Sequence, residues 1–552
     1  MNTFTNVLKE LKEFNSILDN IKSKNTPVQI TGCIDSQKCH LINGLGENYK
    51  WKVIITHNEL KAKEIYEDYQ LFDKNVFLYP AKDIIFYSAD IHGNAIVNDR
   101  LKILRRLIEN KPTTIITTLD GGMDKILPFH ILEENKIKIN ESSSLDLMKL
   151  AEKLVEMGYE RQGQVERPGE FAIRGGILDV FSATEEGPIR IELWGDEVDS
   201  IRYFDAYSQR SIESVEEVTI YPASEFILDK KTIRQGFLQI EKEKKEYVEK
   251  LRSNMKTEEA FRIDSIINEF KENLESFQGS VGINSYIQYF YDDTVSLFDY
   301  FDKDNSLIFI DEPNRVVERG QGVELEFRES MISRIEKGYI LPSQSNSIFS
   351  HKELLAKLNQ KNLLLISTMD VKQQAFTIKE KWDFTVRSMN PYNNNFELLV
   401  EDLKEWKKNG YRVLLLSSSN ARAMRLSESL REHDLNSFYT QDLEREIQNS
   451  EIMVSSGSLH RGFEYPLIKF VIISESDIFG KVKKKKRKKY RDHQGKKIKS
   501  FSELKVGDYI IHENHGLGIY QGIEKLEVDN IAKDYIKIQY GDGGVLYILA
   551  TG

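Results

Sequence analysis

The chain has 552 residues, of which 40% are hydrophobic and 30% are charged. This length predicts about three or four domains of roughly 150 residues each, and the apolar content excludes a disordered chain. No apolar run approaches the roughly 18 residues needed to cross a bilayer, and residues 1–14 lack the apolar core of a signal peptide. With two cysteines, Cys33 and Cys39, we expect a cytoplasmic protein without membrane contact.

Positive charge is concentrated in one short segment, although the net charge of the chain is −10. Residues 481–491 (KVKKKKRKKYR) carry nine basic side chains and no acid. Such a block repels itself and is typical of an extended linker or an interaction tail. We interpret residues 481–499 as a basic linker that acts as a solvated hinge, with weak DNA contact as the alternative.

The N-terminal region alternates strands and helices. An amphipathic helix over residues 1–20 precedes predicted strands at 28–31, 52–56, 76–79 and 113–117. This alternation predicts a parallel sheet with crossover helices, the α/β class. The character changes at 122–215, where β-rich runs separated by Gly, Pro and acidic turns indicate an inserted α+β domain. A long charged helical stretch then covers about 229–277.

The remaining regions complete a multidomain α/β chain. Residues 394–480 alternate helices and strands, which predicts a small α/β domain, and residues 500–552 are β-rich with glycine-containing turns, which predicts a small β-barrel. The predicted domains are therefore 1–121 and 216–393 (one α/β domain in two parts), 122–215 (its insert), 394–480, the linker 481–499, and 500–552.

Residues 32–39 (GCIDSQKC) lie between a predicted strand and helix, where a phosphate loop of the pattern GxxxxGK[ST] belongs. Gly32 and Lys38 are in register. Gln37 replaces the second glycine, whose lack of a side chain lets backbone N–H groups surround the phosphates. Cys39 replaces the hydroxyl that would hold Mg²⁺, and a thiol is a poor ligand for this hard cation. We therefore predict a degenerate nucleotide site with no bound cofactor.

Two further segments are similar to motifs of nucleotide-driven motors. The apolar run LIFIDE ends in Asp311 and Glu312, as the strand of a Walker B motif does. Residues 412–474 are similar to the second RecA-like lobe of superfamily 2 helicases, but no QxxGRxxR motif follows, so no arginine is available for a γ-phosphate. We interpret all three segments as relics of an ATP site in a degenerate RecA-like fold.

The segment 167–211 combines arginines and aromatic residues on predicted strands. Arg174, Arg190 and Arg202 lie on or beside these strands, with Trp194 and Phe204 close by. Arginine and aromatic side chains on one sheet face are typical of interface hot spots. The alternative is a solvated strand face with ordinary salt bridges.

No other catalytic pattern is present in the sequence. The ten histidines form no HExxH spacing, two cysteines cannot build a zinc site, and there is no GxSxG motif. We predict neither catalytic residues nor a metal.

Three strings of residues resemble the bacterial transcription-repair coupling factor (Mfd) family. In the predicted insert these are RPGEFAIRGGILDVF and IRIELWGDEVDSIRYFD, which are shared in weaker form with UvrB. Near the C-terminus, LKVGDYIIHENHGLGIYQGIEKLEVDNIAKDYIKIQYGDGGVLY resembles the family's RNA polymerase interaction domain, which is CarD-like with a Tudor-like barrel. The resemblance covers essentially the whole chain and implies an N-terminal fragment of such a protein.

The resemblance also implies partners and binding residues. The insert is expected to bind UvrA as UvrB does, through Arg174, Arg190, Arg202 and Phe204. The C-terminal module is expected to bind the RNA polymerase β subunit by adding a strand edge, through Ile523, Lys525 and Leu526; a buried core position is the alternative for Leu526. The stretch 79–100 is shorter than the DNA-clamping hairpin of UvrB, which implies that no damage clamp is present.

We therefore expect a monomeric docking platform without ATPase activity, acting in transcription-coupled nucleotide excision repair. The resemblance implies that the full-length protein is an ATP-dependent DNA translocase, whose motor, with its ATP, Mg²⁺ and main DNA contacts, lies beyond residue 552. The alternatives are an active UvrB-class ATP-dependent helicase and a CarD-like transcription regulator. Gln37, Cys39 and the missing arginine motif favour the docking platform over the helicase.

Overall fold

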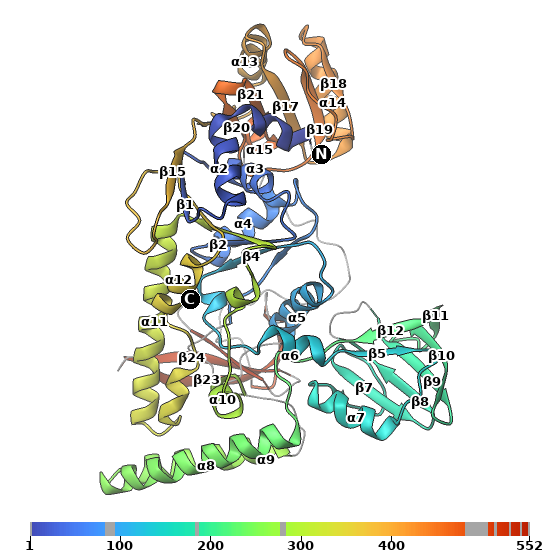
Figure 1. Ribbon diagram of the computed structural model, residues 1–552, viewed down its shortest axis with the longest axis vertical. Helices are drawn as coiled ribbons and strands as arrows, with labels where there is room; N and C mark the ends of the chain where they lie inside the picture. The colour runs from blue at the N-terminus through green and yellow to red at the C-terminus, as the bar shows by residue number, and fades with distance from the viewer. Residues whose placement is uncertain are drawn as a thin grey trace.

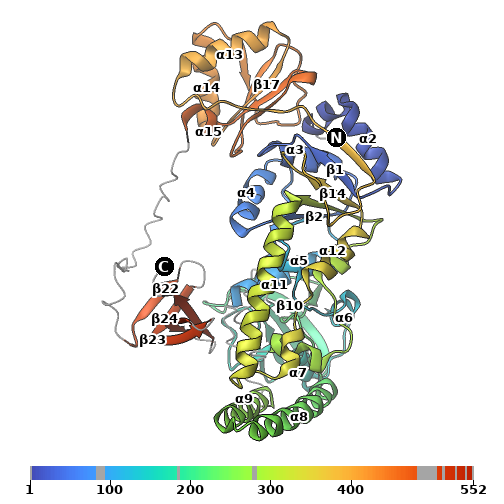
Figure 2. The same ribbon diagram turned by 90° about the vertical axis from the view of Figure 1, so that its left-hand side faces the viewer.

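The protein is a multidomain α/β chain with one parallel sheet and several smaller sheets (Figures 1 and 2). A computed structural model describes residues 3–82, 94–182, 187–275, 283–480, 506–512, 516–528, 531–540 and 544–549. Among these residues, no helix is both long enough and apolar enough to cross a membrane. The predicted linker 481–499 lies outside the described residues, as do residues 83–93 of the stretch 79–100.

The first sheet has seven parallel strands in the order β15-β1-β14-β13-β2-β4-β3. In that order the strands are Glu380–Asp383, Val28–Thr31, Leu363–Ile366, Ser306–Asp311, Trp51–Thr56, Thr113–Thr118 and Val76–Leu78. Nearly all of their residues from β1 to β4 are buried, as expected of a parallel sheet covered on both faces.

Helices cover both faces of this sheet. One face packs in a common apolar cluster with the 3-10 helix η1 (Val7–Glu10), α2 (Lys12–Lys22), α3 (Gln37–Leu45) and α4 (Glu59–Tyr69). The other face packs against α5 (Asn94–Ile108), α11 (Pro313–Glu336) and α12 (His351–Asn359). Because β1 leads into α3, the predicted phosphate loop lies at the carboxyl end of the sheet, where ligands bind in such folds.

The insert is built on a six-stranded sheet in the order β11-β10-β9-β8-β7-β6. These strands are Ser211–Ser214, Glu197–Phe204, Ile189–Trp194, Ile177–Val180, Glu170–Arg174 and Glu160–Arg161. A separate pair joins β5 (Ile137–Asn140) to β12 (Glu217–Ile220), so the β-structure of the insert continues past the expected boundary at 215.

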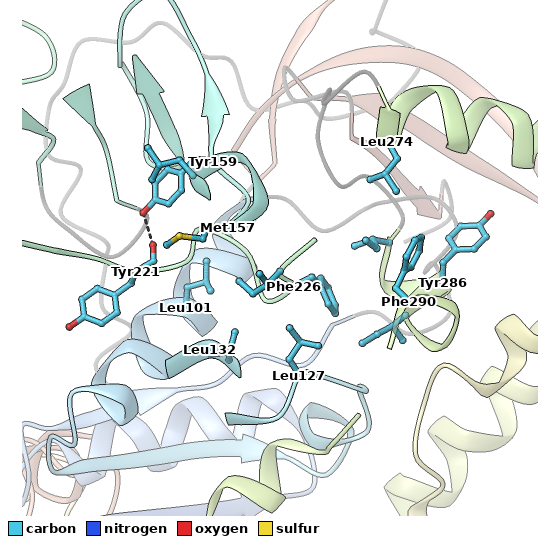
Figure 3. Packing of buried hydrophobic residues seen from close by; sticks show 14 of the residues in the cluster. Leu101, Leu127, Leu132, Met157, Tyr159, Tyr221, Phe226, Leu274, Tyr286 and Phe290 are labelled. Carbon is cyan, nitrogen blue, oxygen red and sulfur yellow. Dashed lines mark hydrogen bonds between the residues drawn. The ribbon is translucent and has the colours of Figure 1, made fainter. Parts of the chain in front are cut away.

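One face of the insert sheet belongs to the largest apolar cluster of the described residues. This cluster also takes in α6 (Phe129–Glu134), α7 (Leu147–Glu156), α8 (Lys230–Ser253), α9 (Thr257–Glu275) and α10 (Ile283–Phe290). Figure 3 shows Leu101, Met157, Tyr159 and Phe226 converging there, with the Tyr159 hydroxyl donating to the Tyr221 carbonyl at 2.6 Å. The predicted helical stretch 229–277 is two helices, because Met255 has a positive φ of 60° between them.

A third unit, residues 387–480, carries a mixed sheet in the order β16-β20-β21-β17-β19-β18. The strands are Arg387–Ser388, Phe463–Tyr465, Phe470–Ile473, Arg412–Ser417, Ile452–Ser456 and Ser437–Tyr439. Strand β16 and the buried Met389 and Tyr392 precede the expected start at 394 and belong to this unit. Helices α13 (Phe396–Lys408) and α14 (Asn420–Glu432) fit the predicted alternation of helices and strands, and a short helix, α15 (Glu475–Phe479), ends the unit.

The C-terminal module is a four-stranded antiparallel sheet in the order β22-β23-β24-β25. Its strands are Tyr509–His512, Gly516–Val528, Ile531–Gln539 and Val545–Leu549. Among the described residues β22 and β25 do not pair, so the part of the module that is described is an open sheet rather than a closed barrel.

Candidate functional site

The predicted phosphate loop, residues 32–39 (the relic loop), begins where the chain leaves β1. Gly32 has φ +75°, and a Cβ at this position would lie 2.0 Å from the carbonyl oxygen of Phe384. Glycine is therefore required here both by the backbone conformation and by the close approach of the segment after β15. This glycine has a packing reason that is independent of phosphate binding.

The structure brings Lys38 together with Asp311 and Glu312, as the sequence predicted for a relic of a nucleotide site. Lys38 Nζ lies 2.7 Å from Asp311 Oδ1 and 2.6 Å from Glu312 Oε1, and the lysine is 8% exposed. Burial opposes the charged ammonium, but the two carboxylates outweigh it and raise the pKa of Lys38 above its ordinary value. The lysine charge is thus already neutralised inside the protein.

Gln37 and Cys39 are both turned into the protein interior. The amide N–H of Ile34 donates to Gln37 Oε1 at 3.0 Å, and Gln37 Nε2 donates to the Tyr465 hydroxyl of the third unit at 2.9 Å. Cys39 is buried, with its Sγ 3.8 Å from the Ile65 carbonyl, and burial raises the pKa of its thiol well above the ordinary value. A buried, protonated thiol is a poor metal ligand.

The described residues contain no group of three or more His, Cys, Asp or Glu side chains placed to hold a metal ion. At the relic loop itself, the lysine, the glutamine and the acidic pair bond to one another or to neighbouring protein groups. The polar groups of the loop are therefore paired within the protein.

The second candidate site is the outer face of the insert sheet. Strand register places Arg190, Glu192 and Trp194 of β9 on one face with Asp179 of β8 and Arg202 of β10, opposite the apolar core. We call this surface, together with Arg174 of β7, the charged face. The sequence predicted the arginines of this surface, but not which acidic side chain each of them pairs with.

One buried carboxylate holds two of the arginines of the charged face. Asp179 Oδ1 accepts from Arg190 Nε at 2.7 Å, while its Oδ2 accepts from Arg190 Nη2 at 2.8 Å and from Arg174 Nη2 at 2.6 Å. The Arg190 side chain is 14% exposed and the Arg174 side chain is 44% exposed. Arg174 can therefore contact a partner directly, whereas Arg190 mainly holds the sheet together.

Phe204 is fully buried, so the prediction that it contacts a partner requires a correction. Its ring lies beneath the guanidinium of Arg190, 4.4 Å from Cζ to the ring centroid. This is cation–π support for a charged side chain rather than a contact surface. Arg202 is partly exposed and pairs with Glu192.

Trp194 is the exposed aromatic residue of the charged face. It is 85% exposed at the end of β9, where it pairs with Glu197 of β10. The sequence placed Trp194 near the arginines, but it was not among the predicted UvrA-binding residues, although the alternation of residues 190, 192 and 194 along one strand puts it on their face. An exposed tryptophan next to arginines is a strong hot-spot candidate.

The third candidate site is the β23–β24 hairpin of the C-terminal module. β22 pairs with β23 only up to Ile519, and β25 pairs with β24 only from Tyr535 onward, so residues 521–528 and 531–534 project beyond both edge strands. Their outer backbone edges are not paired by any other described strand.

The register of this hairpin assigns faces to the predicted polymerase-binding positions, whose side chains lie outside the described part. Position 523 is opposite the buried Ile536, and position 525 lies on the same face. Position 526 lies on the other face with Glu524, which pairs with Lys537. The alternation therefore separates 526 from the buried side of the sheet.

Two of these segments match known domain families. Residues 137–226 match the UvrB interaction domain, and residues 504–550 match the CarD-like/TRCF RID domain. The insert and the C-terminal module are members of these two domain families.

Along almost its entire length the chain is related to transcription-repair-coupling factors. It is 31% identical to that of Bacillus subtilis and 31% identical to that of Staphylococcus haemolyticus, over 99% and 97% of this chain but 46% and 45% of the relatives. The protein of Staphylococcus aureus strain MRSA252 is 29% identical over 99% of this chain and 46% of its own length. The chain thus spans about half the length of the curated relatives it matches.

Proposed function

We propose that this chain is a docking platform for transcription-coupled nucleotide excision repair, joining a repair protein to RNA polymerase. The observation that carries the proposal is the presence, on one chain, of a UvrB interaction domain and a CarD-like/TRCF RID domain. Through the insert the chain binds UvrA in the way UvrB does. Through the C-terminal module it binds the RNA polymerase β subunit. A monomer in the cytoplasm fits this role.

The charged face is the proposed UvrA surface. Arg174, Arg202 and Trp194 are the exposed groups, and Arg190 and Phe204 support them from below. A β-augmentation site at the projecting edge of β23, near position 526, is the proposed polymerase contact.

We further propose that the first sheet is a degenerate RecA-like fold that binds no ATP. In its support, β14 lies between the strand of the relic loop and the strand that ends in Asp311. The ion pairs of Lys38 and the buried Gln37 and Cys39 also favour a site that cannot accept Mg·ATP. The C-terminal module is proposed to complete a CarD-like, Tudor-type barrel.

In the full-length protein this platform is proposed to act together with an ATP-driven DNA translocase. That motor, with its ATP, Mg²⁺ and main DNA contacts, would belong to the part of such proteins that this chain does not span. DNA contact by the present chain is then confined to the basic segment 481–491.

A UvrA pull-down beside a calorimetric titration with Mg·ATP tests the proposal. We expect the chain to capture UvrA and to show no saturable heat with Mg·ATP at millimolar concentration. Trp194→Ala and Arg174→Ala should each reduce UvrA capture by about 30-fold, because an interface hot spot contributes about 2 kcal/mol to binding. Met148→Ala, another exposed apolar residue of the insert, is the control. Micromolar ATP binding would favour the helicase alternative, and polymerase binding without any UvrA capture would favour a CarD-like regulator.

A further inference from the structure

The third unit has helices of its own on only one face of its sheet. Alternate residues of β17, β19 and β21 pack against α13 and α14 in one apolar cluster. The opposite face, which includes Leu414, Leu416 and Phe470, belongs instead to the apolar cluster of the first sheet and of helices η1, α2, α3 and α4. Figure 1 shows α2 and α3 next to β20 and β21. The third unit therefore shares a hydrophobic core with the start of the chain.

A set of polar contacts closes this interface at the relic loop. Asp68 of α4 accepts hydrogen bonds at its Oδ1 from the His460 backbone N–H at 2.7 Å and from His460 Nδ1 at 2.8 Å, and at its Oδ2 from the Ser36 hydroxyl at 2.6 Å. The Ser36 hydroxyl in turn accepts from the Arg461 N–H at 3.1 Å. The backbone N–H groups of His460 and Arg461 thus donate to two side chains at the relic loop, Asp68 and Ser36.

A second contact lies deeper in the same interface. The Tyr465 hydroxyl accepts from Gln37 Nε2 at 2.9 Å and lies 3.1 Å from His40 Nδ1. Phe463 stacks on the His40 ring with centroids 5.6 Å apart. Gln37, the residue that spoils the phosphate-loop pattern, is therefore a specific partner of the third unit.

We propose that the relic loop is an intramolecular binding site whose ligand is the His460–Tyr465 segment of the third unit. Ser36, Gln37 and Asp68 hold this segment, so that the first and third units form one rigid body at the carboxyl end of the first sheet. The first and third units then cannot open and close around a nucleotide, and the third unit keeps a fixed position relative to the first sheet up to its last residue, Gly480. This inference does not depend on which partners the chain binds.

Hydrogen exchange of the full chain, read by mass spectrometry, tests the inference. Asp68→Ala removes three acceptor contacts, and Tyr465→Phe removes the hydroxyl while keeping the ring. In both variants we expect exchange of peptides covering 457–466 and 33–40 to rise about tenfold, with peptides of the insert unchanged. Lys63→Ala, at an exposed position of the same helix, is the matched control and should exchange as wild type.

Unchanged exchange at 457–466 in both variants would overturn the inference, because the apolar core alone would then hold the third unit. Should Asp68→Ala unfold the chain, Tyr465→Phe decides the question, since it buries the same ring. Equal loss of protection in the insert would also contradict the proposed site, because the effect would be global.

Discussion

Asp179 organises the charged face, because this one buried carboxylate bonds to both Arg174 and Arg190. Removing Arg190 would leave Asp179 with Arg174 as its single, more exposed partner. It would also remove the guanidinium that lies over the Phe204 ring. We expect Arg190→Ala to lower the free energy of unfolding by about 2 kcal/mol. Arg174→Ala should change it by less than about 0.5 kcal/mol, as for most exposed pairs.

Urea unfolding of the two variants measures this difference. Because Asp179 is buried, the loss of Arg190 should appear in the stability of the chain as well as in partner binding. Equal stability of the two variants would show that Asp179 does not depend on Arg190. A partner-binding assay of Arg190→Ala must therefore be interpreted together with its stability.

His460 gives the interface between the first and third units a dependence on pH. The hydrogen bond to Asp68 raises the pKa of His460, burial opposes this, and Asp68, Glu64 and Glu67 of α4 add attraction. A raised folded-state pKa stabilises the fold fully below the ordinary value of about 6.5, and this stabilisation is lost as pH rises through the raised pKa. We expect His460→Ala to lower the melting temperature more at about pH 6 than at about pH 9.

Thermal melts of wild type and His460→Ala at the two pH values provide the measurement. His433→Ala is the matched control, because His433 is an exposed histidine of the same unit that bonds to the Ser429 carbonyl within α14. A pH-independent difference for His460→Ala would mean that its ion pairs with Asp68 and Glu67 contribute nothing to stability.

At the scale of elements, the β23–β24 hairpin separates two interpretations of Leu526. Because position 526 shares a face with Glu524, we expect Leu526→Arg to leave the module folded and to abolish binding to the polymerase β subunit, where a charge would be buried without a partner. Ile536→Arg, on the buried face, should instead unfold the module. Circular dichroism and a binding assay with the β subunit distinguish the two.

A folded Leu526→Arg protein that still binds polymerase would contradict both the residue and the strand-edge mechanism. Unfolding of Leu526→Arg would instead show that the residue belongs to the core of the module. Ile536→Arg provides the circular dichroism signal of the unfolded module for comparison.

Elements with strong periodicity were predictable from the sequence, and those defined by distant contacts were not. The strand at 28–31 has the predicted bounds and the strand at 52–56 differs by one residue, because short runs rich in apolar side chains identify buried parallel strands. Strand β15 (EKWD) is largely exposed and joins the sheet only by pairing with β1, which no local pattern reveals. The first region therefore had an edge strand that sequence reasoning missed.

The candidate sites show the same division at the level of single residues. Lys38, Asp311 and Glu312 were predicted from motif spacing and meet in the structure. Phe204 was expected to contact a partner because it lies close to the arginines in the sequence, but its pairing with β11 is irregular and the ring is covered. Asp68 lies in no motif, and nothing in the segment 412–474 linked His460 or Tyr465 to the phosphate loop; only the packing of two distant units brings these residues to the relic loop.

At the scale of the whole molecule, the shared core predicts that the third unit cannot fold alone. A fragment of residues 387–480 would expose the sheet face that carries Leu414, Leu416 and Phe470, which packs with η1, α2 and α3 in the intact chain. We expect this fragment to lack a cooperative thermal transition, whereas residues 1–480 should unfold cooperatively. Near-ultraviolet circular dichroism of both fragments measures this, and a cooperative transition of 387–480 alone would show that its second face needs no cover.

The pairing of charges on the insert also bears on how fast a partner can be found. Arg174 and Arg190 share Asp179, and Arg202 is matched by Glu192, so the field of this face falls off more steeply than that of unpaired arginines. Long-range steering of a partner is then weak, and association is governed by diffusion and correct orientation, at about 10⁵–10⁶ M⁻¹s⁻¹. Capture by this surface would vary little with ionic strength, unlike binding to the polybasic segment 481–491, whose strength falls as salt rises.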